Sequence, residues 1–211
     1  MGQSKVLRAL GRIVCPPIFK LLYRYKTIGT ENIPETGGYI LACNHISYSD
    51  PVLLGVSTKR TLYFMAKAEL FEKSKFFAGL IKALGAFPVK RGANDGKAIN
   101  TGESIIRNGD IMTIFLEGGR SKNGELMRPR SGCALIAKQT QASVIPACIT
   151  VIGNPYNTFS RRVIHFGKPI SVEELGLTGD SGIKELKYAS DKIMDRIKEM
   201  RKADLNEYKR R

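Results

Sequence analysis

The sequence predicts an α/β fold, in which short buried strands alternate with helices around one sheet. Three observations favour this class. The 211 residues suffice for one domain with a real core, 43% of them are hydrophobic, and compact apolar runs alternate with segments of helical spacing. The sequence contains no repeat, no low-complexity segment and no apolar stretch near the ~18 residues that a membrane-spanning helix needs. A globular domain with a short, distinct N-terminal segment is therefore expected.

The N-terminal segment, residues 1–26, differs from the rest of the chain in charge. It carries six basic residues and no acidic one, in a chain of net charge +15. Aliphatic residues recur at helical spacing on both sides of Pro16 and Pro17, so we expect an amphipathic helical segment that the prolines interrupt. Two interpretations stay open: the segment lies on an anionic membrane surface, or it packs against the main domain, residues 27–211.

The elements of the main domain follow from apolar runs and the residues that bound them. Strands are expected at residues 39–43, 62–65, 86–89, 111–116, 144–149 and 162–166, and helices at 76–84, 95–107, 131–139 and from 183 past 200. Asp50 and Pro51 have the pattern of a helix N-cap and first helical residue. Because proline cannot donate to a ladder, Pro146 predicts that its strand lies at a sheet edge or a bulge.

Cysteine usage and charge limit the possible functions. Cys15, Cys43, Cys133 and Cys148 show no C-x-x-C pairing, so neither a metal site nor a disulfide framework is expected, and a reducing compartment is favoured. The positive charge would suit nucleic acid, which we keep as an alternative function. However, no zinc, RNP-type or helix-turn-helix pattern is present, and aromatic residues do not alternate with the basic clusters. We therefore predict no nucleic-acid partner.

The first candidate site is the segment NHISYSD, residues 44–50, directly after an expected strand. One continuous helix would splay His45 and Asp50 about 140° apart, so they can meet only if the chain turns between them. An aspartate that accepts the imidazole N–H would orient His45 as a general base. The alternative, equally open on this segment alone, is that Asp50 caps a helix and His45 is an ordinary loop residue.

Three neighbouring side chains could suggest a different nucleophile. Cys43 lies two residues before His45, but it closes the strand and should point away from a loop histidine. Ser47 and Ser49 lack the G-x-S-x-G pattern of a hydrolase elbow. None of the three is favoured as a nucleophile.

The second candidate site is FLEGGRS, residues 115–121, again at the end of an expected strand. A guanidinium and glycine backbone N–H groups can face one phosphate, because Arg120 offers a planar fork and Gly118 permits close approach. The alternative is a plain turn. Lys90 and Arg91, at the tip of the strand at 86–89, are a basic pair of the kind that usually faces solvent.

Taken in order, these segments resemble the motifs of the glycerolipid acyltransferases. The chain is similar to the 1-acylglycerol-3-phosphate (lysophosphatidate) acyltransferase branch from about Thr27 to Pro169. The first block, N-H-x-S-x-x-D, matches fully, and residues 84–91 resemble the second. The third departs from the common F-P-E-G-T-R-S at Leu116 and Gly119. Lysophosphatidate is the expected acceptor, and glycerol 3-phosphate or a different lysolipid stays open as an alternative acceptor for the same chemistry. The resemblance implies a mixed sheet flanked by helices.

The resemblance also implies roles for residues. His45 would be the general base and Asp50 its orienting partner. Glu117 would hold the glycerol moiety, with Gly118 and Ser121 in the same motif. Arg120 and Arg91, with Lys90, would bind the phosphate. The acyl donor would be acyl-CoA or acyl carrier protein, and neither a cofactor nor a metal is expected.

The apolar helix at 76–84 has two open interpretations. It packs on the core, or its residues line an acyl tunnel, with Phe77, Leu80, Ile81 and Leu84 as the lining. His165, within a strand and without an acidic neighbour in sequence, is expected to be structural. Because the expected acceptor is an anionic lipid, the resemblance and the charge together favour a peripheral protein on the cytoplasmic face of the membrane.

Overall fold

The structure is a computed structural model that describes residues 5–72, 74–89, 96–154, 157, 159–179 and 182–210. Of the helical residues 5–13, 76, 77, 80, 83, 97 and 98 it describes the backbone only. The strands are β1 (Lys26–Ile28), β2 (Tyr39–Cys43), β3 (Leu62–Lys67), β4 (Ala86–Val89), β5 (Ile111–Phe115), β6 (Val144–Ile152) and β7 (Arg161–Phe166). They form one sheet in the order β1-β7-β6-β2-β5-β3-β4. Neighbours are parallel except β6 and β7, so the expected α/β class with a mixed sheet is confirmed.

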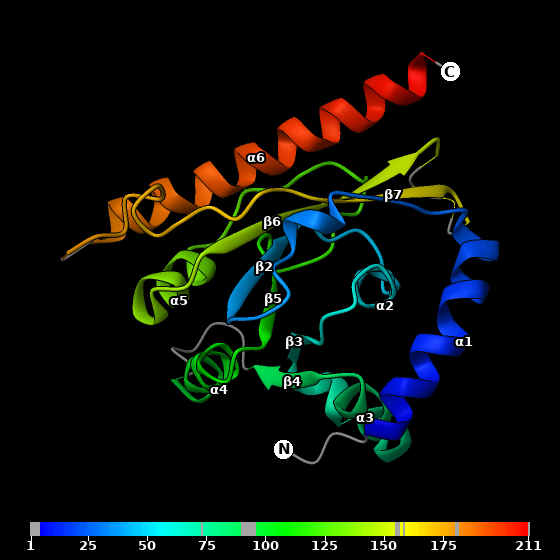
Figure 1. Ribbon diagram of the computed structural model, residues 1–211, viewed down its shortest axis with the longest axis horizontal. Coiled ribbons are helices and arrows are strands. Elements are labelled where there is room, and N and C mark those ends of the chain that lie inside the picture. Colours follow the sequence, from blue (N-terminus) through cyan, green and yellow to red (C-terminus); the bar gives the residue numbers. More distant parts are fainter. Residues whose placement is uncertain are drawn as a thin grey trace.

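Helices cover both faces of this sheet. They are α1 (Lys5–Tyr23), α2 (Asp50–Val56), α3 (Lys75–Ala83), α4 (Gly96–Arg107), α5 (Gly132–Thr140) and α6 (Ile183–Lys209), with short 3-10 turns at Thr30–Asn32 and Ala68–Phe71. Figure 1 shows α6, in orange and red, lying along β6 and β7, with α1 and α2 on the other side of the sheet. The core accordingly has two parts: one joins the sheet to α4, α5 and α6, and the other joins it to α1 and α2.

The strands at the centre of the sheet are buried on both faces. In β2, Ile40 and Ala42 pack toward α5 and α6, whereas Leu41 and Cys43 pack toward α2, as the alternation of side chains along a strand requires. All nine residues of β6 are buried. Continuous apolar runs are typical of parallel strands covered by helices on both faces, which explains why they were detectable in the sequence.

Pro146 was expected at a sheet edge or at a bulge, and of these two the edge is wrong. Its strand, β6, lies inside the sheet between β7 and β2, and Pro146 faces Ala42 in the register. The Pro146 carbonyl accepts from the Gly167 N–H at 2.8 Å, just beyond the β6–β7 ladder, which ends at Ala147 and Phe166. A strand residue presents its N–H and C=O to the same side, so the missing donor falls where this ladder stops. Beyond this point Val144 faces Ile170, where an unbroken register would place Pro169, so the pairing contains one extra residue, as at a bulge. The bulge, not an edge position, accommodates the proline.

The expected interruption of the N-terminal helix is also wrong, because α1 runs through Pro16 and Pro17 without a break in its assignment. Proline's fixed φ is itself helical, so the chain can continue while two backbone donors are lost. At its end, Tyr23 is buried in the core, as is Tyr25 just after it. Within the described residues, none of the helices combines the length and apolarity needed to cross a bilayer.

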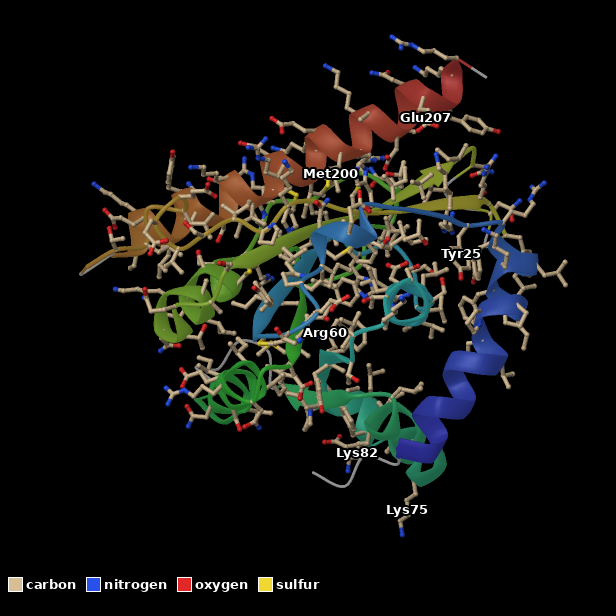
Figure 2. All side chains as sticks on the ribbon, in the orientation of Figure 1. Tyr25, Arg60, Lys75, Lys82, Met200 and Glu207 are labelled. Carbon is tan, nitrogen blue, oxygen red and sulfur yellow. The ribbon has the colours of Figure 1, made fainter. Side chains whose placement is uncertain are left out.

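Arg60 joins the loops at the far end of the sheet from the candidate motifs. Its guanidinium donates to the carbonyl oxygens of Pro34 at 2.5 Å, Gly37 at 2.7 Å and Gly109 at 2.6 Å (Figure 2). These residues precede β2 and β5, so one side chain ties together the loops that enter the two central strands. This contact helps to hold β2 and β5 in the register that the candidate site uses.

Candidate active site

The register of β2 and β5 brings the two candidate motifs together. The two strands are parallel, and their last residues, Cys43 and Phe115, are partners. His45 and Glu117 each follow two residues later. Two backbone hydrogen bonds continue the pairing past the strands: the Leu116 N–H donates to the Cys43 carbonyl at 2.9 Å, and the Ser121 N–H to the His45 carbonyl at 2.8 Å.

This edge is also where the chain leaves the sheet in two directions. After β2 the chain enters α2 on one face, and after β5 it reaches α5 on the other face. Ligands of open α/β sheets bind at the carboxyl ends of the strands, at such a switch point. The geometry therefore favours a binding site between the β2 and β5 loops.

His45 and Asp50 form a pair, as one of the two sequence interpretations required. His45 Nδ1 lies 2.8 Å from Asp50 Oδ2, and the carboxylate side chain is fully buried while the imidazole is 15% exposed. Because an ionised carboxylate only accepts, we assign the Nδ1 proton to this bond, which leaves Nε2 to exchange a proton with a substrate. The chain turns between the two residues, which is what the five-residue spacing demanded.

Asp50 does not cap α2, so the helix-cap alternative is wrong. The helix begins at Asp50 itself, and its preceding residue, Ser49, makes no side-chain cap bond. The same Asp50 Oδ2 accepts the N–H groups of Ile46 at 2.7 Å and Ser47 at 2.8 Å. The carboxylate thus turns back toward the loop before it and stabilises the turn that presents His45.

Two further side chains fix the position of His45. Its ring stacks on Phe115, with centroids 3.9 Å apart and planes 14° apart. The preceding Asn44 is fully buried; its amide donates to the Ile149 carbonyl at 3.0 Å and its oxygen accepts the Ile149 N–H at 2.8 Å. Asn44 therefore acts as a bridge to β6. The sequence analysis gave Asn44 no role, although a polar residue directly after a buried strand was a usable signal.

Glu117 supports the backbone of the histidine loop. Its carboxylate is buried, and its two oxygens accept the N–H groups of His45 at 3.2 Å and Met127 at 3.3 Å. Burial raises the pKa of Glu117 from 4.5 to about 7, against the lowering effect of these two hydrogen bonds. The structure thus places this side chain against the His45 backbone; its expected contact with a glycerol moiety stays a prediction.

The rest of the third motif lies around the same loop. Gly118 has a φ of +64°, and a Cβ there would lie 2.6 Å from the Arg130 side chain, so this turn requires glycine. Ser121 is buried and donates its hydroxyl to Asn123 at 3.0 Å. Arg120 is exposed, and its guanidinium lies 3.5 Å from the centroid of the Tyr48 ring. This cation–π contact places a cation beside the histidine loop.

Several expected site residues fall outside what the structure describes. Lys90 and Arg91 lie outside the described residues, and so do the side chains of Phe77 and Leu80. Of the remaining residues proposed for an acyl tunnel, Ile81 is half-buried and Leu84 is exposed. The tunnel therefore stays a prediction.

The second histidine also has an aspartate partner, which its sequence surroundings did not suggest. His165 Nδ1 lies 2.9 Å from Asp204 Oδ1, and Asp204 Oδ2 accepts the Thr150 hydroxyl at 2.7 Å. The partner comes from α6, 39 positions along the chain, so no local pattern could reveal it.

Cys43, which was not favoured as a nucleophile, contacts the Asn44 side-chain oxygen at 3.6 Å. Burial raises the pKa of its thiol well above the usual range.

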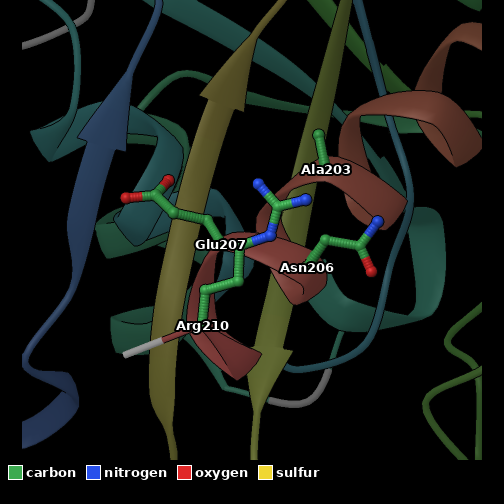
Figure 3. A pocket seen from close by; sticks show the side chains of 4 residues that line it. All are labelled: Ala203, Asn206, Glu207 and Arg210. Atoms are coloured by element: carbon green, nitrogen blue, oxygen red, sulfur yellow. The ribbon is translucent and has the colours of Figure 1, made fainter.

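A hollow elsewhere on the surface is lined by Ala203, Asn206, Glu207 and Arg210 (Figure 3). These four residues follow one face of the last turns of α6, and neither candidate motif contributes to the lining. Among the described residues, no group of three His, Cys, Asp or Glu side chains could hold a metal ion. The His45 loop is thus the better candidate for chemistry.

Comparisons with known proteins identify the family of the chain. A family model described as "Acyltransferase" matches residues 24–150. The chain is 32% identical over 123 residues to the 1-acyl-sn-glycerol-3-phosphate acyltransferase of Bacillus subtilis, covering 58% of this chain and 60% of that protein. It is 30% identical over 159 residues to the protein of the same name from Streptococcus pneumoniae, covering 74% and 59%. The chain thus spans about three fifths of the length of these relatives.

The fold also has a solved counterpart. It is similar to the crystal structure of the 1-acyl-sn-glycerophosphate acyltransferase PlsC from Thermotoga maritima, with a TM-score of 0.66 and 23% identity. The match covers 93% of this chain and 78% of that one. This similarity supports the fold, and the match of the family model confirms that the motifs are those of an acyltransferase family.

Proposed function

The chain belongs to the Acyltransferase family, and on that premise we propose that it moves a fatty acyl group from a thioester to the free hydroxyl of lysophosphatidate. The product would be phosphatidate. The observation that carries this proposal is the His45–Asp50 pair, with Nδ1 bound to a buried carboxylate and Nε2 left for the substrate. The names of the two bacterial relatives supply the acceptor and support its choice.

In the proposed reaction, His45 Nε2 takes the proton of the acceptor hydroxyl as that oxygen attacks the thioester carbonyl. A C–O bond forms, the C–S bond breaks, and the imidazolium returns the proton to the departing thiolate. Asp50 stabilises the imidazolium while it exists, without taking the proton itself. Oriented base catalysis of this kind is worth about 10²–10⁴-fold in rate.

The acceptor's phosphate would bind next to this pair. Arg120 suits that role because it is exposed beside Tyr48, on the loop whose Ser121 N–H is bonded to the His45 carbonyl. Lys90 and Arg91 are further proposed phosphate ligands by family resemblance. Glu117 would act mainly by holding the His45 backbone, which the two hydrogen bonds to its carboxylate support.

We also propose that α1 lies on an anionic membrane surface, on its cytoplasmic side. Val14, Ile18 and Leu21 are 51%, 48% and 81% exposed, while the end of the helix is anchored by buried Tyr23. Exposed aliphatic residues on a basic helix suit the boundary between headgroups and acyl chains. Residues 1–26 would thus bring the site to a lipid acceptor, and the donor would be acyl-CoA or acyl carrier protein.

The function is tested by detecting the product by mass spectrometry. Purified protein is mixed with oleoyl-CoA and either lysophosphatidate in anionic vesicles or glycerol 3-phosphate. The proposal expects phosphatidate in the first reaction and little lysophosphatidate in the second. Product from glycerol 3-phosphate alone would overturn the proposed acceptor but keep the chemistry. If no product forms with either acceptor, whether the donor is oleoyl-CoA or oleoyl-acyl carrier protein, the proposed function is overturned.

The phosphate role of Arg120 has a matched control. Arg120→Ala should raise KM for lysophosphatidate more than KM for the thioester. Arg107→Ala removes an exposed arginine on α4 that pairs with Glu103, outside the site, and should change neither constant. Equal KM values for Arg120→Ala and the wild type would remove Arg120 from acceptor binding.

A further inference from the structure

Arg162 is a cation buried in the interior of the protein. It lies on β7, is 1% exposed, and shares its face of the strand with Ile164 and Phe166, which both belong to the core next to α1 and α2. Its guanidinium faces the Tyr23 ring at 5.6 Å. Within the described part of the chain, Arg162 Nε and Nη1 are buried without a hydrogen-bond partner. A buried, unsatisfied cation is costly, so it needs a compensating partner.

The carboxylate of Asp50 also has a buried atom that lacks a hydrogen-bond partner. The Oδ2 atom accepts three donors, but Oδ1, also buried, has no hydrogen-bond partner among the described residues. The strand pairing places the two residues at the same end of the sheet. Arg162 faces Val151 at the carboxyl end of β6, two residues past Ile149, which holds Asn44 beside the His45 loop.

The electrostatics link the two groups. Burial lowers the pKa of Arg162, while the negative charge of Asp50 is the larger of two opposing influences and Tyr23 is the smaller. An arginine stays protonated despite such a shift, so it presents a full positive charge to the carboxylate. The surroundings of Asp50 also include Glu117 after β5, which repels it when ionised, and Cys43 at the end of β2, whose buried thiol stays neutral.

We propose that Arg162 is a positioning residue, whose buried positive charge attracts Asp50 and keeps that carboxylate in the orientation that fixes the tautomer of His45. The inference rests on the proposed role of His45 as the base. Arg162 lies on β7, beyond residues 24–150 that the family model matches, so the inference adds a residue outside that segment to the candidate active site. The Tyr23 ring lies near the guanidinium, so the end of α1 contributes to this buried arrangement.

The proposal makes a signed prediction for His45. A nearby positive charge disfavours the imidazolium, so replacing Arg162 with a neutral side chain, while Asp50 keeps its three donors, should raise the pKa of His45. Arg162→Met keeps the length of the side chain and removes its charge. Arg162→Lys keeps the charge and should leave the pKa of His45 close to that of the wild type.

This shift can be measured without substrate. The chain has two histidines, so NMR of ¹⁵N-histidine-labelled protein can follow both imidazoles across pH, with His165→Asn used for assignment. His165 lies on the other face of the sheet and serves as an internal reference. Folded Arg162→Met with an unchanged pKa of His45 would overturn the proposal, and so would an equal shift in Arg162→Lys.

Stability gives an independent test if Arg162→Met folds poorly. Asp50→Asn should lower the melting temperature because it leaves Arg162 buried without its opposite charge. Adding Arg162→Met to Asp50→Asn should recover part of this loss, whereas simple addition of the two single effects would contradict the coupling. Both tests are independent of the acceptor. If the protein forms phosphatidate but Arg162 and Asp50 show no coupling, this inference is overturned and the proposed function stands.

Discussion

The two histidines of this chain form nearly the same pair with an aspartate, on opposite faces of one sheet. The Nδ1-to-carboxylate distances are 2.8 Å for His45–Asp50 and 2.9 Å for His165–Asp204, and the imidazole side chains are 15% and 21% exposed. Both aspartates are buried. Distance and burial therefore do not separate the pair proposed to be catalytic from the other.

The surroundings of the two carboxylates differ. Asp50 Oδ2 also accepts two N–H groups of the loop that carries His45, at the carboxyl ends of β2 and β5. Asp204 instead accepts the Thr150 hydroxyl, and so ties α6 to the middle of β6. One pair organises a loop at the site edge, whereas the other fastens a helix to the sheet. A histidine–aspartate pair thus points to catalysis only when a binding edge presents its free nitrogen.

The two pairs should differ most when each aspartate is replaced by asparagine, which removes its charge. Asp50→Asn should lower kcat by about 10²–10⁴-fold, because the imidazolium loses its charge partner and the tautomer is no longer fixed. Asp204→Asn should leave kcat close to the wild-type value. Initial rates of phosphatidate formation measure both, and an equal loss in the two variants would make the pairs functionally indistinguishable.

The second buried carboxylate at the site, Glu117, should make stability depend on pH. Its folded-state pKa is about 7, above the unfolded value near 4.5, so the folded state binds the extra proton between these values. Stability from this group is full below about pH 4.5 and is lost as the pH rises through about 7, by roughly 3 kcal/mol.

Glu117→Gln should remove this contribution. Urea unfolding of the variant at pH 5 and pH 8 should show a smaller loss of stability with rising pH than the wild type does. The comparison between the two pH values matters more than either stability, because glutamine cannot accept both the His45 and Met127 N–H groups. Identical pH dependence in the two proteins would contradict the raised pKa.

The structural role of the second pair predicts a loss of stability. Asp204→Asn places an amide against either His165 or the Thr150 hydroxyl, and leaving one buried group unsatisfied costs about 1–3 kcal/mol. Thermal unfolding measures it. Thr150→Val removes the hydroxyl donor and leaves Asp204 Oδ2 buried without a partner, so it should cost a similar amount. An unchanged melting temperature in Asp204→Asn would show that the pair does not hold α6.

The two faces should also differ in their affinity for lipid, which is the smallest expected effect. Leu21→Glu on α1 should weaken binding to anionic vesicles several-fold, since burying one leucine is worth about 1–2 kcal/mol. Ile183→Glu alters an even more exposed aliphatic residue, 84% against 81%, at the start of α6. It should leave vesicle sedimentation unchanged, and equal losses would indicate a nonspecific effect of charge.

Local patterns predicted most of the elements because strands covered on both faces are continuous apolar runs. The His45–Asp50 pair is also a local feature. Five residues and one turn suffice to build it, so the motif alone could suggest it. The position of Glu117 beside the His45 backbone follows once the two parallel strands β2 and β5 end in register. These features depend on contacts within one strand–loop–helix unit or between two adjacent strands.

The features that the sequence did not predict depend on distant contacts. Asp204 reaches His165 from a helix 39 positions away, and β1 is three residues long, too short for a pattern. For Pro146 the edge alternative was wrong, because the place of a strand within a sheet depends on strands that are distant in sequence. Arg162 did leave a signal, since it alternates with Ile164 and Phe166 on one face of an apolar strand, where an arginine needs an explanation.

The central claim is that the His45 imidazole, and not any histidine paired with an aspartate, carries out the proton transfer. The most direct measurement compares His45→Ala and His165→Ala in the same phosphatidate-forming reaction, with circular dichroism confirming that both are folded. The account predicts no product above background from His45→Ala and a rate close to wild type from His165→Ala. Retained turnover in folded His45→Ala would contradict it.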